Sequence, residues 1–159
     1  MILVLLGTQD KPFLRLLKMV SKEIDKGNIK EKVVAQTGYT AFSDKNMESF
    51  DFKNKEEIEK LIDKARIIIT HAGVGTITES LEKGKKIIVV PRLKKYLEHT
   101  NDHQMQITKE FEMKGYVIAL YDKSRLSAAL EKIKTFKPKK YESNSENFKM
   151  KIKDYIDNI

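Results

Sequence analysis

The segment from His71 to Glu79, HAGVGTITE, places a histidine, two glycines and an acid close together. It follows a run of β-branched residues and leads into a helical pattern. Gly73 and Gly75 allow the backbone to turn sharply and a ligand to approach its N–H groups. Because a helix start carries unpaired N–H donors and partial positive charge, this arrangement favours an anion, most simply phosphate. The imidazole of His71 can donate to the same oxygen atoms.

Two interpretations without a ligand remain open for this segment. Thr76 to Glu79 matches the capping-box pattern, so Glu79 could serve only to stabilise the helix start, by about 1 kcal/mol. His71 could be a hydrogen-bonded histidine at the end of a strand. Capping does not exclude ligand binding, since an acid at a helix start can serve either role.

Two common nucleotide-binding motifs are excluded. The segment GVGTIT has Thr78 at the position where a dinucleotide fingerprint needs its third glycine, and the next apolar run ends in Pro91-Arg92 instead of an acid. The P-loop pattern G-x-x-x-x-G-K-[ST] does not occur in the chain.

A second polar cluster lies in the segment 97–104, LEHTNDHQ. Its side chains suit a hydroxyl-rich ligand, because each can bond one or two hydroxyl groups in a fixed geometry. The candidate substrate-binding residues here are His99, Asn101, Asp102, His103 and Gln104. His99 and His103 could share a metal on one helix, but Thr100 and Asn101 resemble helix caps, which places His99 before the helix. We therefore predict no metal site.

Apolar patterns predict the elements that position these residues. Strands are expected at 1–6, 32–38, 47–52, 66–70, 86–91 and 116–121. Helices are expected at 11–24, 53–65, 76–84, 101–115 and 123–136, with an amphipathic helix near the C-terminal end. Because the strands are continuous apolar runs that alternate with helices, we predict an α/β fold, a Rossmann-like parallel sheet with helices on both faces.

We expect one α/β domain at residues 1–136, followed by a tail at 137–159 whose helix packs on the domain or on a partner. Ligands of such sheets bind at the carboxyl ends of the strands. This rule selects Gly7, Thr8 and Gln9 after the first strand, the His71 segment after the fourth, and Arg92 with the second cluster after the fifth.

Composition narrows the class of protein. A formal charge of +8 favours anionic partners, although lysine is also an ordinary solvated residue. The chain has no cysteine, which excludes disulfides, thiolate zinc sites and a thiol nucleophile. No apolar stretch approaches the roughly 20 residues that span a bilayer, and no targeting segment is recognised, so we expect a cytoplasmic protein.

The two motifs HAGVGTITES and PR…EHTNDHQ together resemble the C-terminal, donor-binding domain of glycosyltransferase family 28, which has the GT-B fold. The similarity covers roughly residues 1–120. It is greatest to the small free-standing subunits of two-component transferases, namely the eukaryotic dolichol-linked N-acetylglucosaminyltransferase and bacterial capsule and exopolysaccharide enzymes. The string from Pro91 to Gln104 favours the bacterial group, although Leu97 stands where that group commonly has glycine.

The resemblance implies a role for each motif. Glu79 would accept hydrogen bonds from the ribose of a uridine nucleotide. The diphosphate would contact His71 and the backbone N–H groups of the next loop, which are those of Gly73, Val74, Gly75 and Thr76. Asp102, His103 and Gln104 would hold the donor sugar, while Gly7, Thr8 and Gln9 would line the cleft.

The resemblance further implies the donor-binding subunit of an inverting transferase, which moves a hexose or N-acetylhexosamine from a UDP-sugar to a lipid-linked acceptor. One α/β domain is half of a GT-B enzyme, so a membrane-associated partner would bind the acceptor and hold this chain at the inner face of the membrane. We expect the partner to carry the catalytic base, with His71 and His103 left open as exceptions because histidine suits proton transfer near neutral pH. We expect no cofactor, no metal and no nucleic acid.

Three other functions compete with that of a donor-binding transferase subunit. A self-sufficient epimerase would need two domains. A flavodoxin-like signalling domain would need an acid cluster after the first strand, where only Asp10 stands. A non-catalytic subunit that stabilises a self-sufficient transferase remains open, because a binding site does not prove turnover by this chain.

Overall fold

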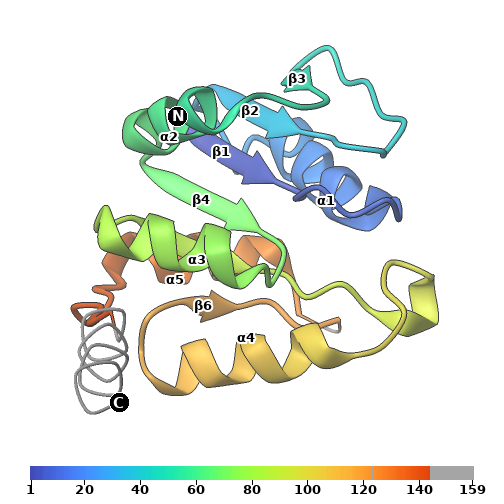
Figure 1. Cartoon of the computed structure of the whole chain (residues 1–159). Helices are drawn as coiled ribbons and strands as arrows, with labels where there is room; N and C mark the ends of the chain where they lie inside the picture. The colour runs from blue at the N-terminus through green and yellow to red at the C-terminus, as the bar shows by residue number, and fades with distance from the viewer. Residues whose placement is uncertain (123, 144–159) are drawn as a thin grey trace.

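The computed structural model describes residues 1–122 and 124–143. Within these residues, six parallel strands form one sheet (Figure 1). The strands are β1 Ile2–Leu5, β2 Val33–Gln36, β3 Glu48–Phe50, β4 Ile67–Thr70, β5 Lys86–Val89 and β6 Ile118–Ala119. Their order in the sheet is β3-β2-β1-β4-β5-β6. The predicted α/β class with a parallel, Rossmann-like sheet is therefore confirmed.

Helices cover both faces of the sheet (Figure 1). They are α1 Leu14–Asp25, α2 Lys55–Lys64, α3 Val74–Glu82, α4 His103–Met113 and α5 Leu126–Thr135, with a short 3₁₀ helix η1 at Lys94–Tyr96. The buried residues of α1 and α5 pack on one face, whereas α2, α3 and α4 pack on the other. Each layer alone would leave an apolar face of the sheet in water, so the two layers together complete the core.

The strands are apolar throughout because both of their faces are buried. In β1, Ile2 and Val4 pack into the α1–α5 layer, while Leu3 and Leu5 pack towards α2. All four residues are buried. This arrangement is the physical reason that these strands show no alternation of polar and apolar residues.

The central strands end at one level. Leu5 is paired with Gln36 of β2 and with Thr70 of β4, and Thr70 is paired with Val89 of β5. The chain winds from β1 towards β2 and β3 on one side, then returns to β4 and continues the other way. The carboxyl ends of β1 and β4 therefore flank the switch point of the sheet, where parallel α/β sheets form a crevice.

The helix after β4 begins earlier than its sequence pattern suggests. α3 begins at Val74 with Gly73 as its N-cap, and no side chain caps it. The capping-box interpretation of Thr76 and Glu79 is therefore wrong, because Thr76 already lies inside the first turn. A true capping box occurs at α2, where Asn54 and Glu57 bond each other's backbone N–H groups.

The start of the predicted tail packs against the domain. The backbone N–H of Lys139 donates to the carbonyl of Gly115 over 3.0 Å. The ring of Tyr141 contacts that of Tyr116 edge to face, with 5.4 Å between centroids. The amphipathic helix expected further on lies outside the described residues. Among the described helices, none combines the length and the apolar character that crossing a bilayer requires.

Candidate functional site

His71 lies at the switch point, with its ring against two glycines. A Cβ atom added to Gly7 would lie 2.6 Å from Cε1 of His71, and one added to Gly73 would lie 2.7 Å from the same atom. Gly7 also has a φ angle of 78°, which side chains rarely adopt. The turns after β1 and β4 thus need glycine in order to admit the imidazole between them.

The hydrogen bonds of His71 define its tautomer. Its Nδ1 lies 3.3 Å from the hydroxyl oxygen of Thr70, whose proton is donated to the carbonyl of Leu5, and 3.4 Å from that carbonyl oxygen. Both oxygens are therefore placed to accept, which favours the tautomer with the proton on Nδ1. Burial of the ring, together with the nearby charge of Arg92, lowers the pKa of His71 to about 4. At neutral pH the ring is therefore uncharged, and its Nε2 holds a free electron pair between the two glycines.

The first turn of α3 is open to a ligand. Because no side chain caps this helix, the N–H groups of Val74, Gly75 and Thr76 have no side-chain acceptor. A Cβ atom added to Gly75 would meet nothing within 4 Å outside its own helix. The absence of a side chain at Gly75 therefore does not serve internal packing, and it leaves space in front of the backbone donors.

Glu79 lies one turn further along α3. Its Oε1 atom is buried and has no hydrogen-bond partner among the described residues. A buried carboxylate oxygen without a donor costs free energy. A ligand hydroxyl or N–H group would remove that cost, so this oxygen of Glu79 can accept a hydrogen bond that the described residues do not supply.

The loop after β1 completes this edge. Gly7 donates its N–H to the side-chain oxygen of Gln36 at the end of β2, over 3.2 Å. Thr8 is exposed and Gln9 is partly exposed. The structure therefore brings Gly7 and the His71 segment together at adjacent strand ends.

Gln104, at the start of α4, connects the two loops. Its Oε1 atom accepts from the backbone N–H of Ala72 over 3.2 Å and from that of Arg92 over 3.0 Å. The side chain is buried. Its amide nitrogen makes no hydrogen bond to any described residue, so this end of Gln104 remains available as a donor.

The other polar residues of this loop bond mainly to the loop itself. Asn101 accepts from the N–H of His103 over 3.0 Å, and Asp102 accepts from the N–H of Lys94 over 2.9 Å. His99 accepts from the N–H of Asn101, and His103 contacts Gln106. As predicted, His99 precedes the helix that carries His103, so the two do not share a helix face. The described residues contain no cluster suited to a metal ion.

Arg92 supports the loops from inside. Its side chain is 1% exposed and donates to the carbonyls of Leu6, Lys11 and Glu98. Its guanidinium also lies 4.8 Å from the centroid of the Phe13 ring. Burial lowers the pKa of Arg92 to about 10, so it is still charged at pH 7. The predicted contact of Arg92 with substrate is untested. Its hydrogen bonds to the carbonyls of Leu6 and Lys11 indicate that it supports the loop after β1.

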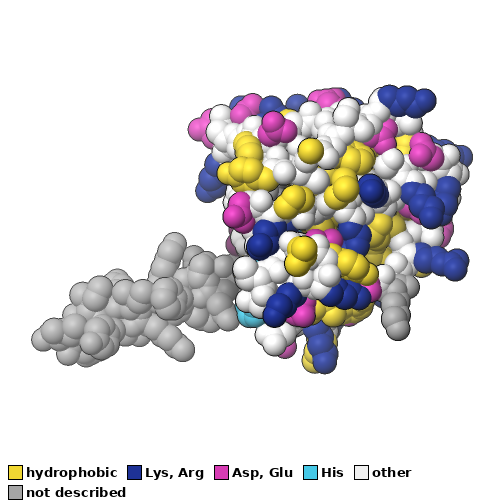
Figure 2. All heavy atoms as spheres, turned by 90° about the vertical axis from the view of Figure 1, so that its right-hand side faces the viewer, with side chains coloured by type: hydrophobic (Ala, Val, Ile, Leu, Met, Phe, Trp, Pro, Cys, Tyr) yellow, Lys and Arg dark blue, Asp and Glu magenta, His cyan; other side chains and the backbone are white. Residues whose placement is uncertain are grey.

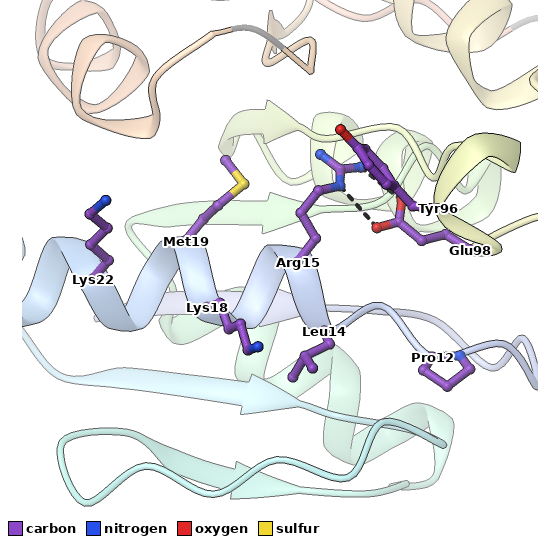
Figure 3. Close-up of a pocket in the computed structure, with 8 residues that line it drawn as sticks. All are labelled: Pro12, Leu14, Arg15, Lys18, Met19, Lys22, Tyr96 and Glu98. Carbon is purple, nitrogen blue, oxygen red and sulfur yellow. Dashed lines mark hydrogen bonds and ion pairs between the residues drawn. The ribbon is translucent and has the colours of Figure 1, made fainter.

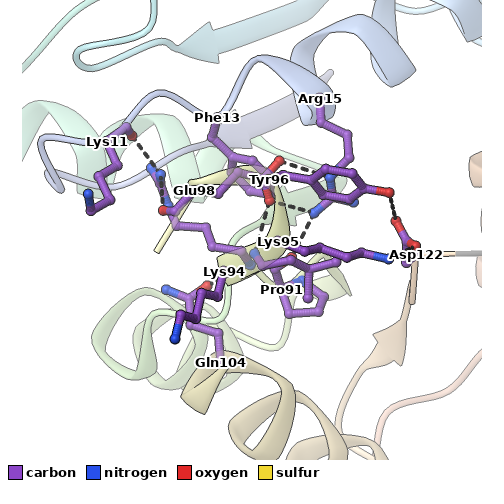
Figure 4. A network of polar contacts seen from close by, with 12 residues as sticks. Lys11, Phe13, Arg15, Pro91, Lys94, Lys95, Tyr96, Glu98, Gln104 and Asp122 are labelled. Carbon is purple, nitrogen blue, oxygen red and sulfur yellow. Dashed lines mark hydrogen bonds and ion pairs between the residues drawn. The ribbon is translucent and has the colours of Figure 1, made fainter. Parts of the chain in front are cut away.

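Sequence reasoning missed a second support, Glu98 (Figure 4). This buried acid binds Arg15 of α1 through both carboxylate oxygens, over 2.9 and 2.8 Å, and also accepts from the N–H of Leu93. Arg15 in turn lies between the rings of Phe13 and Tyr96, 5.2 Å from each centroid. The partners are 83 positions apart, and no local pattern indicates such a pair.

Comparisons with known proteins place the sequence in a family. The family model of the glycosyltransferase family 28 C-terminal domain matches residues 1–159. Over 66 residues, 42% of this chain, the sequence is 35% identical to the UDP-N-acetylglucosamine transferase subunit ALG13 of Homo sapiens, and the match spans 6% of that protein.

Solved structures support the fold. The solution structure of ALG13 superimposes with a TM-score of 0.58 at 20% identity, covering 94% of this chain and 93% of that one. The crystal structure of the kitacinnamycin glycotransferase gives a TM-score of 0.63 at 18% identity, covering 84% of this chain but 34% of that one. The second match indicates that the fold described here corresponds to part of a larger GT-B enzyme.

Proposed function

Because this chain belongs to glycosyltransferase family 28, as its C-terminal domain, we propose that it binds the UDP-sugar donor of a two-component transferase. The observation that carries the proposal is the buried Oε1 atom of Glu79, which has no partner among the described residues. Ribose hydroxyls are donors of the right kind for this oxygen. The open first turn of α3 lies next to it in the chain, where the diphosphate would bind.

The diphosphate would contact three kinds of donor. The N–H groups of Val74, Gly75 and Thr76 favour an anion because the helix start is also partially positive. His71 is neutral in the free protein, with its Nε2 electron pair facing the same space. A neighbouring diphosphate raises the pKa of an imidazole, so His71 would take up a proton and then donate from Nε2.

The sugar would lie against the start of α4. Gln104 offers its amide nitrogen there, and the exposed side chains of Asp102 and His103 flank it. Similarity to the ALG13 subunit, whose name specifies UDP-N-acetylglucosamine, favours that donor among hexoses and N-acetylhexosamines. A lipid-linked acceptor, bound by a membrane-associated partner, would follow from the same relationship, whereas the bacterial capsule and exopolysaccharide role stays a prediction from the Pro91–Gln104 string.

In the proposed reaction, an acceptor oxygen attacks the anomeric carbon of the sugar and UDP leaves with the bonding electrons. This chain would stabilise the negative charge that develops on the leaving diphosphate, with donors fixed before the reaction begins. The general base would belong to the partner. No cofactor enters this scheme.

Calorimetric titration of the purified chain with UDP tests the proposal, with ADP as the control ligand. We expect UDP to bind and ADP not to bind. In Glu79→Ala, loss of hydrogen bonds to a charged acceptor should weaken UDP binding about tenfold or more. Unfolding by urea should show no loss of stability in this variant, because the buried oxygen of Glu79 has no hydrogen-bond partner among the described residues.

The matched control is Glu82→Ala, which removes an exposed acid from the same helix. It should leave UDP affinity unchanged. Equal weakening in both variants would reduce the effect to general electrostatics. If UDP binds neither the chain nor the chain purified with its partner, the donor-binding proposal fails.

A further inference from the structure

A groove lies between α1 and the segment that follows β5, next to the candidate donor site (Figure 3). It encloses about 590 Å³ and is lined from α1 by Leu14, Lys18 and Lys22, and from the far side by Tyr96 and Glu98. A second hollow of about 540 Å³ continues it towards Arg125 at the start of α5. The two share Tyr96 and Lys22, so they form one surface along α1.

An apolar tip stands at the rim of this groove. Leu97 is 79% exposed and Tyr96 is 47% exposed. Among described residues other than glycine, Leu97 alone has a positive φ angle, 58°. A bulky side chain in this conformation is strained and gains nothing from burial here. Leu97 thus stabilises neither the local backbone nor the core, which points to a contact outside the chain.

The surface around the tip is positive. Lys18, Lys22 and Arg125 are exposed, and none of them forms an ion pair with a described residue. Three nearby acids are already paired, although Asp102, which accepts from the backbone N–H of Lys94, has no ion-pair partner among the described residues. Glu98 is bound by Arg15, Glu23 by Lys26, and Asp122 by Lys95. Free positive charges therefore surround an exposed leucine and tyrosine.

We propose that this α1–η1 face, defined by Leu14, Lys18, Lys22, Tyr96, Leu97 and Arg125, binds directly to an anionic membrane surface. Lysine side chains reach anionic headgroups while their stems cover apolar surface, and tyrosine suits the boundary between headgroups and acyl chains. A protein partner fits less well, because the cores of protein interfaces are depleted in lysine. Charge complementarity and the apolar tip together favour lipid.

The η1 end of the face, which carries Tyr96, lies at the same end of the sheet as the candidate donor site, whereas α1 runs back from there to Lys22 (Figure 3). Figure 2 looks from the side towards which the strands point, and it shows hydrophobic side chains interspersed with Lys and Arg. η1 and Leu97 belong to the loop that leads into Gln104. If the proposed function holds, lipid contact here would bring the donor sugar to the membrane surface, where a lipid-linked acceptor is found.

Sedimentation of the full chain with lipid vesicles tests the proposal. We expect binding to vesicles of phosphatidylcholine and phosphatidylglycerol, much weaker binding to phosphatidylcholine alone, and loss of binding in high salt. Neutralising one lysine or arginine near an anionic leaflet weakens binding about fivefold. The triple variant Lys18→Gln, Lys22→Gln, Arg125→Gln should therefore bind about a hundredfold more weakly, with UDP affinity unchanged.

The matched control is Lys30→Gln, Lys60→Gln, Lys64→Gln, which removes the same charge from exposed positions away from this face. It should keep most of the vesicle binding. Leu97→Gly should also weaken vesicle binding while leaving the fold at least as stable, a combination that a purely structural role for Leu97 does not produce. Equal losses in the two triple variants, or no binding to anionic vesicles, would overturn the proposal. The second result would leave the face to an anionic protein partner.

Discussion

The loop after β4 and the loop after β5 contain similar polar residues, yet the structure uses them differently. In the first, α3 has no side-chain cap and Glu79 keeps a buried oxygen without a partner among the described residues. In the second, Asn101 and Asp102 accept backbone hydrogen bonds, and Arg92 donates to three carbonyls. The first loop leaves its groups open to a ligand, whereas the second uses most of its own to hold a shape.

Gln104 combines the two uses, because one end of its side chain supports the loops and the other is open to a ligand. Its oxygen bonds to the backbone of each loop, and its nitrogen remains free of described partners. The contrast shows that residue type alone does not separate a ligand contact from a support. Experiments that measure stability and UDP binding in the same variants can separate them, because supports should change the first strongly and open groups should change mainly the second.

The largest effect on stability is expected from Arg92. In Arg92→Ala, the carbonyls of Leu6 and Lys11 lose their donor and the packing on Phe13 is lost. Unsatisfied buried acceptors cost about 1–3 kcal/mol each, so the free energy of unfolding in urea should fall by about 3 kcal/mol or more. Such a loss would confirm that Arg92 stabilises the folded loops, in contrast to the groups after β4 that are open to a ligand.

Arg66→Ala provides the matched control. Arg66 forms an ion pair with Glu31, but its side chain is 57% exposed. Exposed pairs contribute about 1 kcal/mol or less. If the two arginine variants lose the same stability, Arg92 is not the internal support inferred here, and its predicted contact with substrate gains weight.

An intermediate effect is expected from the histidines. The pKa of His71 is about 4 in the folded chain, below the ordinary value of 6.5, because the ring is buried. Between these values the unfolded chain binds more protons, so stability should decrease as pH falls. From pH 7 to pH 5, unfolding in urea should show a loss of about 1–2 kcal/mol from this group.

His71→Asn should remove that part of the pH dependence, although it could lower stability at pH 7. His103→Asn changes the exposed histidine of the other loop and should leave the pH dependence intact. A slope that disappears in His103→Asn but persists in His71→Asn would reverse the assignment of the buried group.

Much of the fold could be predicted because a strand buried on both faces is apolar throughout. The strands predicted at 66–70 and 1–6 are confirmed as β4 and β1. The strand order was not readable, since nothing in the run that forms β4 identifies β1 as its neighbour. The expected strand at 116–121 proved shorter, because only Ile118 and Ala119 pair with β5.

The site was less predictable for a similar reason. The glycine spacing around His71 predicted an anion site, and the family resemblance predicted ribose binding by Glu79; both stay predictions, whereas the capping box at Thr76 was wrong. The partners of Gln104 are backbone N–H groups, one of them 32 positions away. Every residue except proline has a backbone N–H group, so residue types do not reveal such partners. A polar residue that supports a loop and one that awaits a ligand therefore look alike until the backbone is placed.

Gly75 should give a small change in stability and yet a clear change in binding. A Cβ atom at this exposed position meets no atom outside its own helix within 4 Å. Alanine is the better helix former, so Gly75→Ala should stabilise the fold by up to about 1 kcal/mol. If the diphosphate approaches the first turn of α3 closely, the added methyl group should lower UDP affinity about tenfold, or about 1.4 kcal/mol. Urea unfolding and calorimetry on one preparation would measure both quantities. A variant that is more stable and binds UDP as tightly as before would show that the ligand does not approach this turn. The loop after β4 would then no longer differ from the loop after β5 by being open to a ligand.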